Sequence, residues 1–161
     1  MPPITALLHC SNDALRLGRT LEMLLPCSEI IVIDHQSSDR TTLVARQYGA
    51  RVLEAEINSD NDQSIDLASH DWILRMHPGE SITESLQASL FEFSALPGGS
   101  VQGAAFSVFV REQAADGCWQ ESPQREIRLV PRGRNLRRDR LPGDEPSATA
   151  LEGELWRFVW P

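Results

Sequence analysis

Short apolar runs rich in β-branched residues recur along the first half of the chain. Their length and continuity predict buried strands at residues 4–8, 29–34, 51–54 and 72–76. Apolar residues at helical spacing follow the first two of these runs, over residues 14–25 and 37–48. This strand–helix–strand–helix–strand order predicts a parallel sheet whose crossover connections are right-handed.

Local signals mark where the helices are expected to begin and end. Ser11-Asn12-Asp13 and Ser37-Ser38-Asp39 are predicted to cap the first two helices, which Pro26 and Gly49 then stop. A third helix is predicted from the apolar positions of residues 82–93, and a short helix is predicted over residues 63–69.

The second half of the chain changes to strand and turn signals. Residues 103–112 and 118–120 flank Ala115-Asp116-Gly117, whose Asp-Gly dipeptide predicts a β-hairpin. A further strand is predicted at residues 126–130. We therefore expect a single α/β domain over residues 1–161, with a β-α-β half up to residue 97 and a β-rich half over residues 98–161.

Composition and charge narrow the possible functions. A net charge of −8, with 24% charged and 41% hydrophobic residues, is typical of a globular protein and disfavours nucleic acid as a partner. No apolar run reaches the roughly 18–20 residues of a membrane span. The first residues also lack the basic start of a signal peptide, so we expect no transmembrane segment and a cytoplasmic location. The three scattered cysteines argue against a disulfide framework or a structural zinc site.

Polar residues follow three of the predicted strands at their carboxyl ends, where ligands bind in open α/β sheets. These segments are His9–Asn12, Asp34–Asp39 and His77–Glu80. An ionised carboxylate only accepts hydrogen bonds, so Asp34 could accept from a base N–H or from ribose hydroxyls. Asp39 could act in the same way, or it could cap the second helix.

The order and spacing of several of these segments match those of a known protein family. The likeness rests on residues 4–41, on Tyr48-Gly49-Ala50-Arg51-Val52, on Ala68–Leu74 and on Glu80–Thr83. Together they resemble family 2 glycosyltransferases, and most of all the bacterial branch that contains lipopolysaccharide core transferases. The resemblance covers residues 4–95 well and residues 103–160 loosely.

The resemblance implies a GT-A fold, a three-layer, Rossmann-like α/β fold with a mainly parallel sheet and a C-terminal antiparallel β portion. It also implies that Asp34 and Asp39 contact uridine or another nucleoside, with Asn12 nearby. The implied partners are a nucleotide-sugar donor, most simply a UDP-sugar, and a saccharide or lipid-linked acceptor. The implied reaction is inverting transfer of a hexosyl group, with residues 98–161 as a shortened acceptor-side half.

The segment after the fourth predicted strand departs from the family pattern. The family carries a DADE motif there, whose carboxylates hold Mg²⁺ or Mn²⁺ on the sugar diphosphate, whereas this chain carries His77-Pro78-Gly79-Glu80. Hard cations need oxygen ligands, and Gly79 offers no side chain. His77 and Glu80 could still take Mn²⁺ or a related ion. The alternative is a strand-end turn without metal.

Two features of the second half complete the predicted site. The resemblance aligns Asp144-Glu145 with a family His-Glu pair, which makes Glu145 the candidate general base, with a solvated loop acid as the alternative. Residues 125–140 hold seven arginines. Among them, Arg128 and Arg132 could bind an anionic group such as a diphosphate or a phosphorylated acceptor, or the cluster could be a solvated, partly paired surface.

We therefore predict a nucleotide-sugar-dependent glycosyltransferase domain. The alternative is a catalytically inactive descendant that acts as a binding or interaction module. The departures at His77 and Gly79 favour the alternative, while the fold-determining segments fit both.

Overall fold

The structure is a computed structural model that describes residues 3–55, 67–96, 105–132 and 149–158. Its described strands form one sheet in the order β3-β2-β1-β4-β7-β6-β8-β5. The parallel part contains β1 (Ile4–Cys10), β2 (Glu29–Asp34), β3 (Arg51–Glu54) and β4 (Trp72–Met76). These strands confirm the four predicted from the apolar runs.

The helices of the first half connect the parallel strands as predicted. Helix α1 (Ala14–Glu22) joins β1 to β2, and α2 (Thr41–Gln47) joins β2 to β3. Both helices begin and end within a few residues of their predicted bounds. Of the short helix predicted over residues 63–69, residues 63–66 lie outside the described part of the chain.

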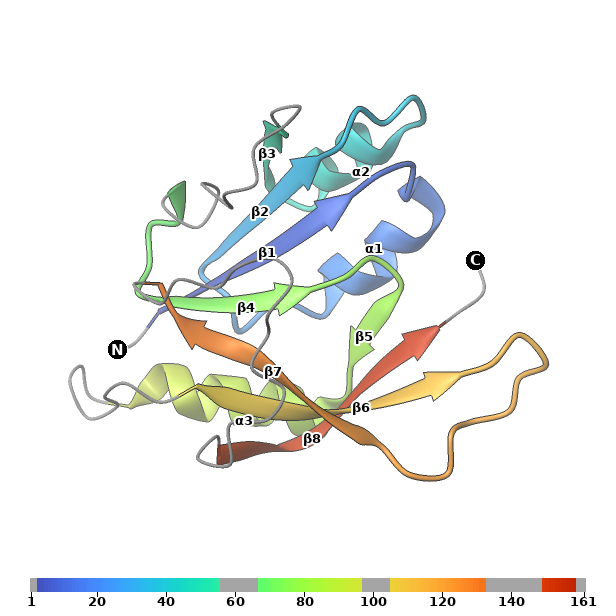
Figure 1. The fold of residues 1–161 in the computed structure, drawn as a ribbon. Helices are drawn as coiled ribbons and strands as arrows, with labels where there is room; N and C mark the ends of the chain where they lie inside the picture. Colours follow the sequence, from blue (N-terminus) through green and yellow to red (C-terminus); the bar gives the residue numbers. More distant parts are fainter. Residues whose placement is uncertain (1–2, 56–66, 97–104, 133–148, 159–161) are drawn as a thin grey trace.

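The second half adds antiparallel strands to the same sheet (Figure 1). After β5 (Glu80–Ile82) and α3 (Glu84–Ala95), the chain forms β6 (Phe106–Gln113), β7 (Gln124–Pro131) and β8 (Thr149–Phe158). Strand β7 is antiparallel to both β4 and β6, and β8 is parallel to β6 but antiparallel to β5. Strands β1–β4, β6 and β8 therefore point in one direction, and β5 and β7 in the other.

Several strands differ from the sequence prediction. Strand β8 was not predicted, nor was the short strand β5, whose Ile82 was expected to belong to the third helix. Residues 118–120 contribute only an isolated bridge between Gln113 and Trp119. Strand β7 is longer than the predicted 126–130. The mixed α/β architecture with a mainly parallel sheet is nevertheless as expected.

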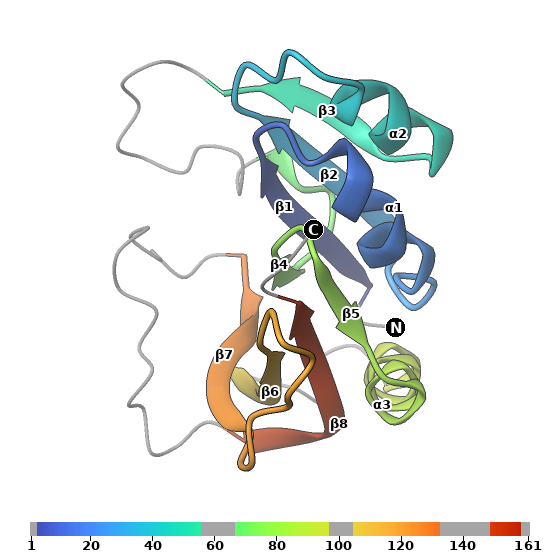
Figure 2. The same ribbon diagram turned by 90° about the vertical axis from the view of Figure 1, so that its right-hand side faces the viewer.

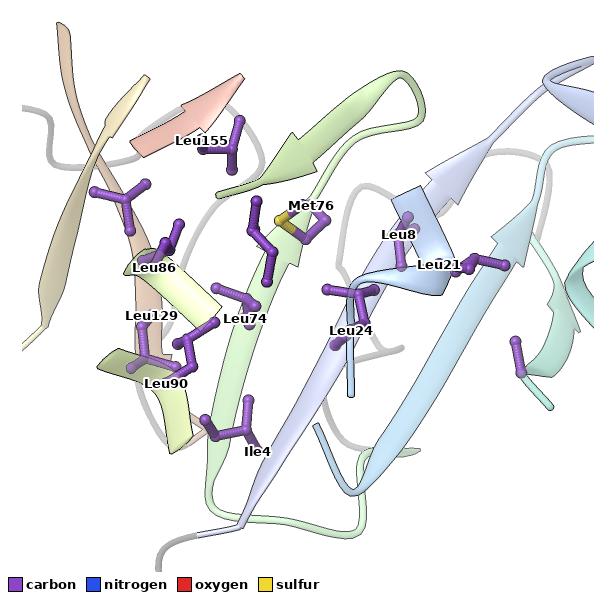
Figure 3. Close-up of a cluster of buried hydrophobic side chains, with 14 of the residues drawn as sticks. Ile4, Leu8, Leu21, Leu24, Leu74, Met76, Leu86, Leu90, Leu129 and Leu155 are labelled. Atoms are coloured by element: carbon purple, nitrogen blue, oxygen red, sulfur yellow. The ribbon is translucent and has the colours of Figure 1, made fainter. Parts of the chain in front are cut away.

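The main hydrophobic core lies between the sheet and the three helices, which occupy the same side of the sheet in Figure 2. Figure 3 shows Leu21 of α1 and Leu86 and Leu90 of α3 facing strand residues such as Leu8 and Leu74. Each such side chain contributes about 1.5–3 kcal/mol when it is fully buried. A second apolar cluster, made of residues such as Leu7, Ile31 and Ile73, covers the other face of the sheet. Burial on both faces explains why the strands read as continuous apolar runs.

Candidate functional site

Three polar segments meet at the edge of the sheet where the parallel strands end. Cys10 of β1 is in register with Asp34 of β2, and Leu8 of β1 is in register with Met76 of β4. The loops that begin at Ser11, His35 and His77 therefore lie side by side along this carboxyl edge, where the arrowheads of β1, β2 and β4 end in Figure 1. The expectation that these three segments lie at the same edge of the sheet is confirmed by the strand register.

Asp34 occupies the last position of β2 and is only 6% exposed. Its Oδ2 accepts a hydrogen bond of 3.3 Å from the backbone N–H of Ser37. Its Oδ1 is buried and has no hydrogen-bond partner among the described residues. A buried acceptor without a donor costs about 1–3 kcal/mol, and such groups are rare in folded proteins. Asp34 is therefore poised to accept a hydrogen bond from a ligand.

Asn12 and Asp39 tie the first two loops together. Asn12 adopts a left-handed backbone conformation with φ 54°, accepts from the backbone N–H of Ser38 at 2.8 Å, and donates its own backbone N–H to the Ser37 hydroxyl at 2.9 Å. Asp39 accepts from the backbone N–H of Ala14 at 3.2 Å. These contacts satisfy the side chains within the protein, so both residues shape the loops that surround Asp34.

The carboxylate of Asp39 also holds the start of α2. It accepts from both the backbone N–H and the hydroxyl of Thr41, and these hydrogen bonds lower the pKa of Asp39. Thr41 is itself buried, and its hydroxyl oxygen accepts from the backbone N–H of Asp13. The alternative in which Asp39 acts at a helix start is therefore present in the structure, for α1 as well as α2.

A histidine pair lies beside Asp34 and was not predicted. His9 Nδ1 and His35 Nε2 are 2.9 Å apart, and the ring centroids are separated by 5.1 Å. The two residues are 26 positions apart. His9 lies near the end of β1, and His35 directly follows β2. Only the pairing of β1 with β2 brings them together, although each lay in a polar segment that the sequence singled out.

The turn after β4 contains a buried ion-pair network. Glu80 is fully buried, and its two carboxylate oxygens accept from Arg128 at 2.8 and 2.7 Å. Arg157 adds a third contact to Glu80 at 3.2 Å, and Glu126 accepts from both arginines. Arg128 has no exposed surface, so the prediction that it binds a phosphate does not fit the structure. Its guanidinium is enclosed by protein carboxylates.

The residues of this turn do not fit a divalent cation. Glu80 is engaged with two arginines, and Gly79 has no side chain; a Cβ there would lie 3.5 Å from Arg16 Cδ. Burial lowers the pKa of His77, which leaves this imidazole neutral, but a single nitrogen ligand is a weak site for Mn²⁺ or Mg²⁺. Among the described residues, no group of three or more His, Cys, Asp or Glu side chains could hold a metal ion.

Arg132 lies at the opposite edge of the sheet from Asp34. Strand β7 runs antiparallel to β4, so Arg132 follows the residue paired with Trp72 at the start of β4. Its guanidinium donates to the carbonyl oxygen of Ala68 at 2.7 Å, and its backbone N–H donates to the carbonyl oxygen of Asp71 at 2.8 Å. The prediction that Arg132 binds the same ligand as Asp34 is therefore not supported by the geometry. Glu145, the predicted general base, lies outside the described residues.

Two proteins named as glycosyltransferases are similar to this chain in sequence. No protein-family model matches the chain. An uncharacterized glycosyltransferase from Rickettsia felis is 31% identical over 91 residues, which is 54% of this chain and 32% of that protein. A second, from Rickettsia bellii, is 28% identical over 88 residues, or 52% of this chain and 30% of that protein. The chain thus spans about a third of the length of these relatives.

Solved structures show the fold. Glucosyl-3-phosphoglycerate synthase from Mycobacterium tuberculosis, in complex with Mn²⁺, UDP and phosphoglyceric acid, matches with a TM-score of 0.56 and 16% identity, over 81% of this chain and 56% of that chain. The same enzyme with Mn²⁺, UDP and glucosyl-3-phosphoglycerate matches with a TM-score of 0.52 and 18% identity, over 71% and 45% of the two chains. The chain has the GT-A glycosyltransferase fold. No helix in the described residues is long and apolar enough to cross a membrane.

Proposed function

We propose that this glycosyltransferase-like domain binds a nucleoside diphosphate sugar at the carboxyl edge of its sheet. The observation that carries the proposal is the buried Oδ1 of Asp34, which accepts no hydrogen bond from any of the residues that the structure describes. A carboxylate can accept only, so its natural partner is an N–H or O–H group of a ligand. A uracil N–H or the hydroxyls of ribose supply such donors, and UDP is bound in the structurally similar synthase.

In this proposal Asn12 and Asp39 support nucleoside binding indirectly, because they hold together the two loops that surround Asp34. Their contacts with Ser37, Ser38 and Ala14 keep both loops fixed around Asp34 before any ligand arrives. A preorganised site loses less conformational entropy on binding than a flexible one.

The test of nucleotide binding is thermal unfolding with UDP, GDP, ADP and CDP. A ligand at about 100 times its Kd stabilises the folded state by about 2.7 kcal/mol, and therefore raises Tm by roughly 5–10 °C in a protein of this size. Asp34→Asn should abolish the rise, because an amide cannot repeat both acceptor positions. Asp71→Asn is the matched control, since that carboxylate is exposed at the opposite edge. The absence of any shift with millimolar nucleotides would contradict the proposal.

We further propose that donor binding needs no divalent cation. Glu80 is neutralised by Arg128 and Arg157, and the positions of the two family aspartates are taken by His77 and Gly79. The Kd for UDP should therefore change no more than a few-fold when EDTA replaces Mn²⁺. A double substitution, His77→Asp with Gly79→Asp, should introduce metal dependence. Strong Mn²⁺ dependence of the unmodified protein would refute this part of the proposal.

The reaction proposed for an active protein is inverting transfer of a hexosyl group to a saccharide or lipid-linked acceptor, with Glu145 as the general base. The second candidate function is a non-catalytic module that binds the nucleotide-sugar without turnover. The observation that favours it is the pairing of Glu80 with Arg128, which engages both carboxylate oxygens. Glu80 is then not available to hold the cation that would offset the charge of a diphosphate leaving group. Release of UDP from a UDP-sugar, absent in Glu145→Gln, would establish the enzyme; binding without release would establish the module.

A further inference from the structure

A cluster of partly exposed aromatic side chains lies on the second half of the sheet. Trp119 comes from the hairpin between β6 and β7, and Trp156 and Phe158 come from β8. The ring centroid of Trp119 is 5.2 Å from that of Trp156 and 5.7 Å from that of Phe158. Both indoles remain 39% exposed, so their rings are in contact with each other and with solvent.

The aromatic cluster lies on the same edge of the sheet as Asp34. Strands β6 and β8 run parallel to each other and in the direction of β4, so the end of β8 and the hairpin after β6 face the carboxyl edge. The backbone N–H of Phe158 donates to the carbonyl oxygen of Gly79 at 3.2 Å. The cluster therefore adjoins the turn at His77–Glu80. Figure 1 shows the β6–β7 hairpin beyond the end of β6, the strand that pairs with β8.

Polar groups surround the exposed rings. The indole N–H of Trp156 donates to Glu154 at 3.1 Å, and Arg111 binds the same carboxylate through two N–H groups at 2.9 and 3.0 Å. On the other side, the guanidinium carbon of Arg19 lies 4.8 Å from the centroid of the Phe158 ring. The surface thus combines flat apolar faces with hydrogen-bond donors and acceptors at their margin.

We propose that Trp119 and Trp156 form a platform on which a pyranose ring of the acceptor saccharide stacks. The proposal rests on the proposed function, because it assigns the acceptor of the same site. A pyranose ring presents an apolar face of C–H groups and a rim of hydroxyls. The indole faces match the C–H groups, and Glu154 and Arg111 can exchange hydrogen bonds with the hydroxyls.

The chemistry of the surface favours a neutral sugar over other occupants. Arg111 and Glu154 pair with each other at the margin, and an apolar peptide or lipid that covered them would take both charges out of water without new hydrogen bonds, which is costly. The net charge of −8 opposes an anionic membrane surface. A second copy of the chain is the remaining occupant, and the experiment below separates it from the sugar.

The test uses saturation-transfer NMR with methyl glycosides of glucose, galactose, mannose and N-acetylglucosamine at tens of millimolar. At least one glycoside should receive saturation from the protein, and its ring C–H protons should show the largest effect because they lie closest to the indole rings. Trp119→Ala and Trp156→Ala should each weaken this binding by about fivefold or more, the loss expected for one aromatic contact. Trp156→Phe should retain most of it. Phe91→Ala is the matched control, because Phe91 is an aromatic side chain on α3 that is 47% exposed.

The outcomes distinguish this proposal from the nucleotide proposal. UDP affinity should be unchanged in Trp119→Ala and Trp156→Ala, whereas Asp34→Asn should lose UDP and keep the glycoside. If the protein binds UDP but gives no glycoside signal, the platform proposal is overturned and the nucleotide proposal stands. If Trp119→Ala and Trp156→Ala bind UDP-glucose more weakly but bind the glycoside as before, the rings contact the donor, and the acceptor role is overturned. Sedimentation that shows a dimer lost in Trp119→Ala, without glycoside binding, would replace the sugar with a second copy.

Discussion

The buried pair between Arg128 and Glu80 allows a quantitative test of the structure. Arg128→Met removes the guanidinium but keeps a similar volume, and it takes from the fully buried Glu80 its two hydrogen bonds to Arg128, at 2.7 and 2.8 Å. Breaking a buried pair on one side costs about 3–5 kcal/mol, because the remaining charge loses its buried partner; Glu80 would keep only the partly exposed Arg157, at 3.2 Å, as a counter-charge. This is a large part of the roughly 5–15 kcal/mol that stabilises a domain.

The assay is equilibrium unfolding in urea together with thermal melting. In a protein of this size each kcal/mol shifts Tm by about 2–4 °C, so Arg128→Met should lower Tm by roughly 6–20 °C. Arg132→Met is the matched control. The guanidinium of Arg132 is 40% exposed and 3.7 Å from Asp71, and such a surface pair contributes about 0–1 kcal/mol.

A double-mutant cycle completes the test. Glu80→Met combined with Arg128→Met replaces the pair with apolar side chains and should recover much of the loss, because neither charge is left unpaired. A loss below about 1 kcal/mol in Arg128→Met would refute the reasoning. Glu80 would then be free of the arginine and available for a metal ion.

Three further predictions concern other parts of the fold. Burial would raise the pKa of Glu126, but the guanidinium groups of Arg128 and Arg157 outweigh it and hold the pKa below the usual range of a glutamate. Stability should therefore fall as the pH drops through that range toward the folded-state pKa, and Glu126→Gln should flatten this fall in urea titrations. Gly153→Ala should cost at least about 2 kcal/mol by thermal melting, because φ is +99° and the new Cβ would lie 2.2 Å from the backbone nitrogen of Leu86. Burial raises the pKa of Cys10 to about 12, so a disulfide reagent at pH 8 should modify the exposed Cys118 quickly and Cys10 only on unfolding.

The first half of the fold was predictable because its signals are local. Each buried strand is a continuous apolar run, and Gly49 closely follows the end of α2 at Gln47, whereas α1 ends at Glu22, before the predicted stop at Pro26. The position of Asp34 was predictable for a related reason. All strands of a parallel sheet end at one edge, so a polar residue that ends one of them must lie at that edge.

The roles of the arginines were decided by the tertiary structure alone. Arg128 is 48 positions from Glu80, and only the insertion of β7 between β4 and β6 brings the two together in the interior. The antiparallel direction of β7 then carries Arg132, four residues later, toward the edge opposite Asp34. Residue types in a local pattern carry no information about strand order or direction.

The same limit applies to the aromatic cluster and to the histidine pair. Trp119 and Trp156 belong to two different segments that both pair with β6, and His9 lies in β1 whereas His35 directly follows β2. The sequence by itself determined strands β1 to β4 and the three helices, because hydrophobic periodicity and turn signals act over a few residues, but it did not predict β5 or β8. The tertiary structure decided which side chains meet, because those contacts depend on the order, direction and register of strands far apart in the chain.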